Sequence, residues 1–202
     1  MTWFAIALNE DVKLGMAIPC RLSGSDLVIW RSALGKVSVW ADRCPHRGMR
    51  LSQGFVRGET LSCIYHGWQY GSEGGCVSIP AHPNLLPPKS ICATKYQCAE
   101  ANGVIWTTLT KTTKAPPLLM EKQIPVRTIH VDGAMNIVAS HFGSPGETVI
   151  KLDSPYTIQI ALQPISDTCT ALHALTSNLT DREGVSVWLE MQRSDLERSQ
   201  AC

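Results

Sequence analysis

Two short segments pair a cysteine with a histidine at spacings that suit metal coordination. Cys44-Pro45-His46 is followed, after sixteen intervening residues, by Cys63-Ile64-Tyr65-His66. Each segment supplies one thiolate and one imidazole. Together they could give one iron of a [2Fe–2S] cluster two sulfur ligands and the other iron two nitrogen ligands, which removes negative charge and raises the reduction potential. The pattern therefore predicts electron transfer at a cluster held by Cys44, His46, Cys63 and His66.

A structural zinc ion is the alternative that the same four side chains allow. Two Cys and two His also satisfy tetrahedral Zn²⁺. Zinc fingers space their ligand pairs differently, however, and Cys-x-His is unusual among them. We therefore favour the iron–sulfur cluster over zinc.

The elements that must position these ligands read as strands. Short alternating or β-branched runs, separated by Gly, Ser and Asp turns, lie at 20–22, 27–31, 37–41 and 103–107. Glycines gather around the two Cys-His segments, as expected where backbone must approach inorganic sulfide and donate N–H groups to it. The first half of the chain is therefore predicted to be a β-sandwich with the ligands on its loops.

The sequence around the ligands resembles the Rieske domain of the non-haem iron oxygenases, most closely the aromatic demethylase subgroup. The resemblance covers at least residues 1–110 and is carried by Arg43-Cys44-Pro45-His46-Arg47-Gly48, 51–54, 65–70, 75–81 and 102–106. It implies a Rieske [2Fe–2S] domain with Cys44, His46, Cys63 and His66 as ligands. Family members usually have Pro where Ile64 stands, and this difference changes turn stiffness, because Pro supplies no ligand atom.

Comparison with respiratory Rieske proteins indicates where the reduction potential of the predicted cluster lies within the range for such centres. Those proteins carry an extra disulfide-forming Cys in each loop, and the matching positions here are Met49 and Tyr65. Where they have a Ser that donates a hydrogen bond to cluster sulfur, this chain has Trp68. Fewer donors to sulfur stabilise the reduced state less, so the resemblance implies a potential near the low end for such centres, roughly −150 mV.

The second half of the chain is also rich in strand signals. We expect a linker over 111–125, then strands at 126–131, 148–152, 156–162 and 168–176, then a helix that starts near Thr180 with a capping box to Glu183. The fold class is therefore mainly β: a Rieske β-sandwich over 1–110, followed over 126–202 by a smaller β-rich (α+β) domain with a C-terminal helix. That helix is faintly similar to the oxygenase C-terminal helix.

The signature of a catalytic iron is missing from this second segment. The resemblance would require an Asp-x-x-His-x-x-x-x-His helix, and the nearest string, residues 136–143, has His141 alone and no Asp. We interpret His141 as structural; the alternative is a metal site completed by Glu147 or another chain. Residues 126–202 also number only 77, too few for the family's catalytic domain. We therefore expect a shortened oxygenase-like domain and assign no catalytic residue.

Other histidines and aromatic residues are interpreted as structural first. His130 and His173 lie in strand patterns whose alternate positions are apolar, so we expect satisfied sheet-surface histidines. His82 lies on the Pro-rich loop that in the family packs over the cluster loops, and could tune the cluster. Trp68, Trp106 and Tyr70 are read as packing residues, with Tyr70 as an alternative donor to cluster sulfur.

The amino-acid composition limits which partners and which cellular compartment we expect. With 17% charged residues and a net charge of +1, neither nucleic acid nor an anionic membrane is an expected partner. The amino end has no basic flank and meets acid after eight residues, so it does not resemble a secretory signal. No apolar run approaches the ~20 residues of a membrane span. We expect the six other cysteines, Cys20, Cys76, Cys92, Cys98, Cys169 and Cys202, to be free thiols in a cytoplasmic protein.

Three functions are compatible with these features. The favoured one is a Rieske-type [2Fe–2S] protein that accepts electrons from a reductase or ferredoxin and donates them to a non-haem iron centre in a catalytic oxygenase subunit. The second is a self-contained aromatic-acid hydroxylase or demethylase with unrecognised iron ligands. The third is a redox-sensing module. Independent oxygenase activity is doubtful on this sequence, and self-association is a further expectation because the second sheet must bury its face.

Overall fold

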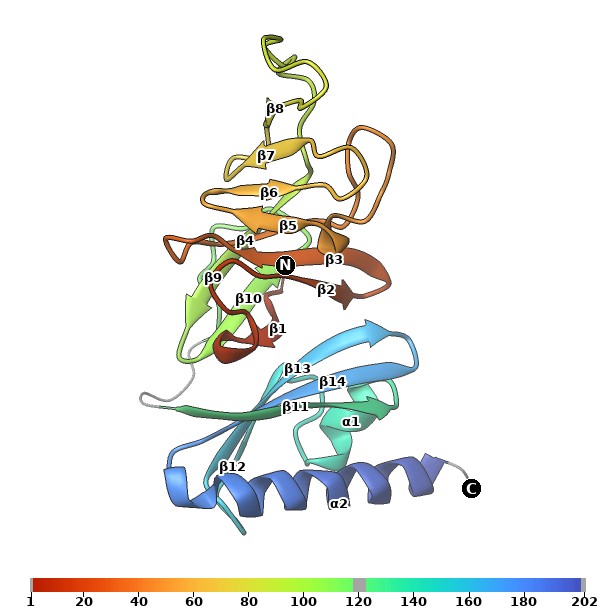
Figure 1. Cartoon of the computed structure of the whole chain (residues 1–202). Helices are drawn as coiled ribbons and strands as arrows, with labels where there is room; N and C mark the ends of the chain where they lie inside the picture. Colours follow the sequence, from red (N-terminus) through yellow and green to blue (C-terminus); the bar gives the residue numbers. More distant parts are fainter. Residues whose placement is uncertain (1, 118–122, 201–202) are drawn as a thin grey trace.

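The computed structural model describes residues 2–117 and 123–200 and is built from three antiparallel sheets (Figure 1). The largest has six strands in the order β1-β10-β9-β4-β3-β2. It curls, so that Ile6 from one edge strand and Leu22 from the other share a core with Ile29 and Ile105. Its strands are β1 (Phe4–Leu8), β2 (Ala17–Leu22), β3 (Ser25–Arg31), β4 (Val37–Ala41), β9 (Lys95–Ala101) and β10 (Val104–Thr108).

A small second sheet carries the Cys-His segments. It consists of β5 (Phe55–Arg57), β6 (Thr60–Ser62), β7 (Gln69–Gly71) and β8 (Cys76–Ser78), paired in sequence order. Leu61 and Tyr70 of this sheet pack on Trp30 and Trp40 of β3 and β4, whose rings meet edge to face at 5.0 Å. Burying these aromatic side chains is what joins the two sheets. The first Cys-His segment precedes β5, and the second connects β6 to β7.

The third sheet lies below the first in Figure 1 and is covered by helices on one face. Its order is β11-β14-β13-β12, with β11 (Ile124–Asp132), β12 (Val149–Leu152), β13 (Ile158–Ser166) and β14 (Cys169–Thr176). Helix α2 (Arg182–Gln200) crosses this sheet and buries Val185, Leu189 and Leu196 against it. The short helix α1 (Met135–His141) adds Val138 and Ala139 to the same core.

The first and third sheets are joined by an apolar contact. Trp3, Leu8 and Trp106 pack against Ala161 and Leu175 of β13 and β14. The β2–β3 turn adds two backbone hydrogen bonds, because Ser23 N–H donates to Pro164 O at 2.7 Å and Gly24 N–H donates to Ile165 O at 3.0 Å. Polar atoms paired in this way fix the two sheets in one relative position.

The predicted fold class is confirmed, with some differences in the elements. Every strand predicted from the sequence is present within a few residues, and β4 has the predicted bounds. The predicted capping box at Thr180 is wrong: Asn178 is the cap, its side chain accepts from Thr180 N–H at 3.1 Å, and a 3-10 turn (Leu179–Asp181) precedes α2. His173 is 2% exposed and therefore not on a sheet surface. Part of the predicted linker 111–125, and Cys202, lie outside the described residues.

Two further 3-10 turns lie at Asn9–Asp11 and Leu51–Gln53. The second of these lies between the first Cys-His segment and β5. Among the described residues, no helix is both long enough and apolar enough to cross a membrane.

Candidate metal centre

The two Cys-His loops have the same backbone frame. In the first, Cys44 N–H donates to Met49 O and Gly48 N–H donates to Cys44 O, both at 2.8 Å. In the second, Cys63 N–H donates to Trp68 O and Gly67 N–H donates to Cys63 O, both at 2.9 Å. Each cysteine therefore begins a closed turn that ends at a glycine four residues later. His46 and His66 lie within these two turns.

The two glycines that close the turns are required by conformation and by space. Gly48 has φ +74° and Gly67 has φ +71°, in the left-handed region where side chains are strained. A Cβ on Gly67 would lie 3.1 Å from Pro80 Cγ, and a Cβ on Gly48 would lie 3.4 Å from Arg43 Nε. The Pro-rich loop therefore packs against the second Cys-His turn, as the resemblance implied for that segment.

The four predicted ligands divide into a buried thiol pair and an outer imidazole pair. Cys44 is 3% exposed and Cys63 is 2% exposed, and both lie in the core that joins the two sheets. Burial, together with the hydrogen bond to Cys44, raises the pKa of Cys63. The rings of His46 and His66 are 4.7 Å apart; the first is half-buried and the second is exposed. Two sulfurs inside and two nitrogens outside fit the donor set of an asymmetric [2Fe–2S] cluster.

The arrangement differs from that of a single metal ion. Across residues 2–117 and 123–200, no group of three or more His, Cys, Asp or Glu side chains could hold one ion. A tetrahedral zinc site would require four such donors around one point. The division into two buried thiols and two outer imidazoles matches a two-metal group whose sulfur and nitrogen ligands lie on different metals.

Tyr70 contacts one of the two thiols, that of Cys44. Its Oη lies 3.0 Å from Cys44 Sγ, and its side chain is fully buried. Burial first, and the hydrogen bond to Cys44 second, raise the pKa of Tyr70, so the phenol keeps its proton. When Cys44 is a thiolate it can only accept, so the Tyr70 O–H donates to sulfur. The sequence left this donor role as the second choice behind simple packing.

Aromatic rings hold the two imidazoles. The indole of Trp68 stacks on His46 with centroids 4.0 Å apart and planes 5° apart, and Tyr65 leans on His66 at 3.9 Å. Lost hydration lowers the pKa of His46, with smaller contributions from His66 and Arg47. A lowered pKa favours the neutral imidazole, which is the form that binds a metal. From the sequence, Trp68 was interpreted as a packing residue.

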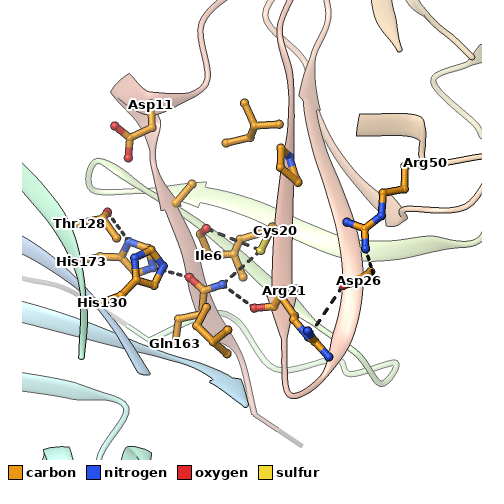
Figure 2. Close-up of a pocket in the computed structure, with 14 residues that line it drawn as sticks. Ile6, Asp11, Cys20, Arg21, Asp26, Arg50, Thr128, His130, Gln163 and His173 are labelled. Carbon is orange, nitrogen blue, oxygen red and sulfur yellow. Dashed lines mark hydrogen bonds and ion pairs between the residues drawn. The ribbon is translucent and has the colours of Figure 1, made fainter. Parts of the chain in front are cut away.

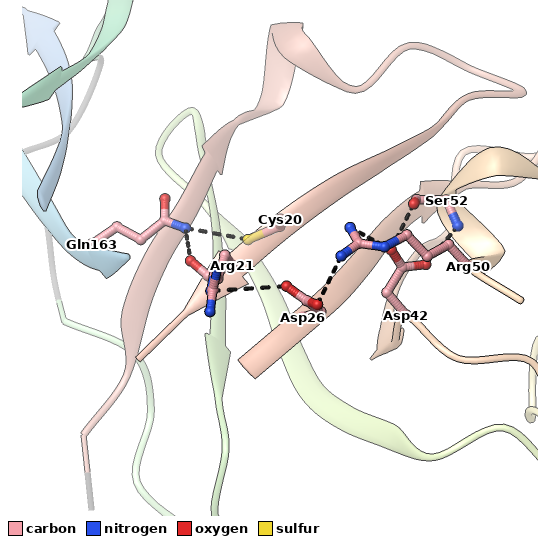
Figure 3. Close-up of polar contacts among 7 residues, drawn as sticks. All are labelled: Cys20, Arg21, Asp26, Asp42, Arg50, Ser52 and Gln163. Carbon is pink, nitrogen blue, oxygen red and sulfur yellow. Dashed lines mark hydrogen bonds and ion pairs between the residues drawn. The ribbon is translucent and has the colours of Figure 1, made fainter. Parts of the chain in front are cut away.

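The base of the first loop is closed by a buried carboxylate (Figure 3). Asp42 accepts hydrogen bonds from Ser52 N–H at 2.7 Å and from Ser52 Oγ–H at 2.6 Å, and its side chain is 1% exposed. Arg50 donates to Asp26 at 2.9 Å and lies 3.9 Å from Asp42. Asp42 and Ser52 therefore join the two ends of the segment that contains Cys44 and His46. This pair was not predicted from the sequence, where an acid two residues before the cysteine was the available signal.

A cleft of about 430 Å³ lies between part of the first sheet and part of the third (Figure 2). On its inner wall His173 contacts Thr128 Oγ1 and Gln163 Oε1, both at 2.8 Å. Gln163 uses its amide N–H groups on Arg21 O and Cys20 Sγ, so its oxygen accepts from His173 Nε2–H, and Nδ1 accepts from Thr128. Burial lowers the pKa of His173 to about 3. This histidine is thus neutral and satisfied, but it is buried, unlike the predicted surface residue.

The remaining predicted histidines stay outside the metal centre. His141 is exposed at the end of α1, with Nε2 3.1 Å from Gln192 Oε1 and its ring edge-on to Phe142. His82 is exposed on the Pro-rich loop, and His130 is exposed on β11 beside the cleft. None of the three contacts the four predicted cluster ligands in any interaction described above.

Comparison with known proteins agrees with this geometry. Residues 2–98 match the family model of the Rieske [2Fe–2S] domain. The chain is 44% identical over 108 residues to "Oxidoreductase NdmD" of Pseudomonas putida, covering 53% of this chain and 18% of the relative. It is 34% identical over 116 residues to "Protein TIC 55, chloroplastic" of Pisum sativum, covering 57% and 21%. The chain spans about a fifth of the length of these curated relatives.

Solved structures show the same fold over nearly the whole chain. The crystal structure of dicamba monooxygenase bound to dicamba superposes with a TM-score of 0.79 at 16% identity, covering 98% of this chain and 86% of that one. Pseudomonas putida NdmA gives 0.70 at 20% identity, covering 99% and 79%. Residues 2–98 therefore form a Rieske [2Fe–2S] domain, and for the rest of the chain the likeness to these solved structures is one of fold. The cofactor of this domain is a Rieske-type [2Fe–2S] cluster.

Proposed function

We propose that this chain transfers electrons within an oxygenase system. It accepts electrons from a reductase or ferredoxin and donates them to a non-haem iron centre in another polypeptide. The observation that carries the proposal is the division of the site, with Cys44 and Cys63 buried and the imidazoles of His46 and His66 at the surface. Relatives named as an oxidoreductase and as a dioxygenase oxygenase subunit support an oxidoreductase role.

The four predicted ligands have distinct tasks in this proposal. Cys44 and Cys63 bind as thiolates within the core, where Leu51 and Leu61 exclude water. His46 and His66 each bind through one ring nitrogen, and their surface position makes them the point of electron entry and exit. When bound, the cluster supplies a one-electron couple. Tyr70 donates a hydrogen bond to Cys44 Sγ, which stabilises the added negative charge.

A self-contained oxygenase is the second candidate, supported by the likeness in fold to dicamba monooxygenase. Such an enzyme needs a further iron on two His and one carboxylate. Within the described part of the chain no group of three His, Cys, Asp or Glu offers this, and His141 is engaged by Gln192. We therefore favour electron transfer to a separate catalytic centre. Iron analysis separates the two: about two irons per chain support electron transfer and about three support an oxygenase.

The thiols agree with a reducing compartment, for which we propose the cytoplasm. All seven described cysteines are free, and Cys20, half-buried beside Gln163, has its pKa raised to about 12 by loss of hydration. Disulfides persist mainly in oxidising compartments. We also retain the predicted division into 1–110, 111–125 and 126–202, and self-association, as parts of the proposal.

The ligand assignment is tested by substitution. Cys44→Ser and His66→Ala should each abolish the visible absorption of the cluster. Cys98→Ser is the matched control, because Cys98 packs in a different hydrophobic core from the two predicted cysteine ligands. Its thiol donates there to Val37 O at 3.6 Å. Intact absorption in the first two variants would refute the assignment. Reduction of the wild-type cluster by dithionite, but by no reductase or ferredoxin, would instead favour a redox sensor.

A further inference from the structure

The cleft between the first and third sheets has an aliphatic lining, and none of the four predicted cluster ligands lines it. Its volume of about 430 Å³ falls in the range of small-molecule sites. Ile6, Ile18 and Ile165 line it, whereas no described Phe, Tyr or Trp does. A flat aromatic ligand would find no ring to stack on there, so the lining suits an aliphatic group better.

Arg21, at one end of the cleft, has hydrogen-bond donors that no described residue uses. It stands opposite Asp26 in the β2–β3 hairpin, and its backbone oxygen accepts from Gln163 at 2.9 Å, so the third sheet helps to fix its position. Its guanidinium Nε lies 3.9 Å from Asp26 Oδ1, beyond hydrogen-bond distance, and the group donates to no described residue. Asp26 instead accepts from Arg50 at 2.9 Å. Five N–H donors of Arg21 are therefore left to water or to a ligand.

Full charges nearly cancel in this cleft, so the unused donors decide which ligand suits it. Arg21 and Arg50 are opposed by Asp26, and a second acid of the lining, Asp11, lies well away from both guanidinium groups (Figure 2). A carboxylate can accept two parallel N–H bonds from one guanidinium, in addition to the attraction between charges. The end of the cleft at Arg21 therefore favours a carboxylate, and the isoleucines favour a hydrocarbon chain attached to it.

Arg50 connects the cleft to the first Cys-His loop. Its guanidinium lines the cleft, donates to Asp26 and lies 3.9 Å from the buried Asp42 at the base of that loop (Figure 3). In the chain Arg50 directly follows Met49, whose oxygen accepts the N–H of Cys44 at 2.8 Å. A carboxylate in the cleft competes with Asp26 for Arg50, and therefore acts on the backbone that closes the Cys44 turn.

We infer that this cleft binds a small aliphatic carboxylate, which acts as an effector of the cluster. The carboxylate lies on Arg21, its hydrocarbon chain lies on Ile6, Ile18 and Ile165, and Arg50 transmits its presence to the first loop. The inference goes beyond the proposed electron-transfer function, because binding requires only the cleft. The effect on the cluster is reciprocal: if the carboxylate changes the redox equilibrium, reduction of the cluster changes the affinity for the carboxylate by the same factor.

Calorimetry of the cluster-loaded chain with hexanoate tests the binding. We expect saturable binding with a Kd of about 1 mM, as befits a ligand with so few atoms. Hexanamide has the same chain without the charge and should bind at least fivefold more weakly. Formate has the charge without the chain and should also bind at least fivefold more weakly, because it buries no aliphatic surface.

Three variants locate the bound carboxylate. Arg21→Gln should weaken hexanoate binding at least fivefold and leave hexanamide binding unchanged. Arg57→Gln is the matched control, because it removes the same charge from an exposed position in β5, outside the cleft. Asp11→Asn should have the opposite effect and strengthen hexanoate binding about twofold, since it removes a like charge from the lining.

The coupling to the cluster is measured by repeating the titration after reduction with dithionite. At 0.15 M salt, where charges more than about 8 Å apart are largely screened, the affinity for hexanoate should fall about twofold to fivefold on reduction. Arg50→Gln interrupts the connection to the first loop, so its oxidised and reduced forms should bind hexanoate within about 1.5-fold of each other. Arg57→Gln should keep the wild-type difference.

The possible failures of the inference are distinct from failure of the proposed function. Hexanoate that binds no more tightly than hexanamide, or equal effects of Arg21→Gln and Arg57→Gln, would contradict a carboxylate site in the cleft. Equal affinities of the oxidised and reduced wild-type protein would contradict the effector role. Either result leaves electron transfer intact, whereas a chain that binds hexanoate as expected but takes no electrons from a reductase or ferredoxin would contradict only the proposed function.

Discussion

Trp68 links the two ligand loops through one residue. Its indole stacks on the imidazole of His46 in the first loop, with centroids 4.0 Å apart and planes 5° apart. Its backbone oxygen accepts the N–H of Cys63 in the second loop at 2.9 Å. The orientation of one predicted ligand and the turn that carries another therefore depend on the same residue.

Removing the Trp68 ring should loosen His46. Trp68→Ala loses a stacking contact worth about 1 kcal/mol, which corresponds to roughly fivefold faster loss of iron to a chelator. Trp68→Phe keeps an aromatic face and should stay near wild type. The measurement is the decay of visible absorption under excess chelator, together with the width of the EPR lines of the reduced cluster. Equal decay rates in all three proteins would show that the stack does not hold the ligand.

Tyr70 should raise the reduction potential through its hydrogen bond to Cys44. Tyr70→Phe removes the donor and keeps the buried ring, so the more negative, reduced state loses about 1 kcal/mol of stabilisation, equivalent to a potential lowered by ~40 mV for one electron. A redox titration followed by EPR measures the shift. Tyr65→Phe is the control, because Tyr65 is largely exposed. A potential that is unchanged or higher in Tyr70→Phe contradicts the donor role.

The contact between Asp42 and Ser52 should stabilise the first loop. Ser52→Ala removes a 2.6 Å hydrogen bond to a buried carboxylate, for which we expect a loss of about 2 kcal/mol in the free energy of unfolding. Amide exchange in residues 43–50 should quicken more than exchange in the third sheet. Ser90→Ala, at an exposed position, should change neither quantity. Uniform exchange changes in both sheets would argue against a local role.

Acid should destabilise the protein through His173. Its pKa is lowered from 6.5 to about 3, mainly by burial, so below pH 6.5 the unfolded chain binds a proton that the folded protein does not. Stability from this group is therefore complete above pH 6.5 and is lost as the pH falls toward 3, by up to about 1.4 kcal/mol per pH unit. The measurement is the melting temperature between pH 7 and pH 5, where carboxylates contribute less.

Two variants isolate the contribution of His173 to this pH dependence. His173→Gln should melt lower than wild type at pH 7 but show a shallower decline toward pH 5. His82→Gln should retain the wild-type slope, because His82 is exposed on the Pro-rich loop, whereas His130 contributes to the lowered pKa of His173 and is not a neutral control. If the slope is the same in wild type and His173→Gln, protonation of this residue does not govern the acid sensitivity.

The sequence predicts four cluster ligands, Cys44, His46, Cys63 and His66, because their residue types and spacing are rare in combination, and this assignment stays a prediction. Strand β4 was also predicted, since four of its five residues are apolar and two of them are β-branched. Strands β5 to β8 have three residues each, too few for an alternating pattern, so they went unpredicted.

Other features depend on contacts between distant segments. His173 alternates with apolar neighbours in the way that a surface position does, but packing of the first sheet on the third buries it. The Trp68 stack and the Asp42–Ser52 contact likewise exist only after the loops close. At Thr180 the local pattern suggested a cap, and Asn178, two residues earlier, supplies the oxygen instead.

Metal analysis combined with EPR tests the central claim most directly. The chain, purified without oxygen, should contain about two irons and two acid-labile sulfides, and dithionite should produce the EPR signal of a [2Fe–2S] cluster with two histidine nitrogens coupled to the unpaired electron. Labelling histidine with ¹⁵N should change those couplings. One zinc without sulfide, or a cluster signal without nitrogen coupling, would contradict ligation by His46 and His66.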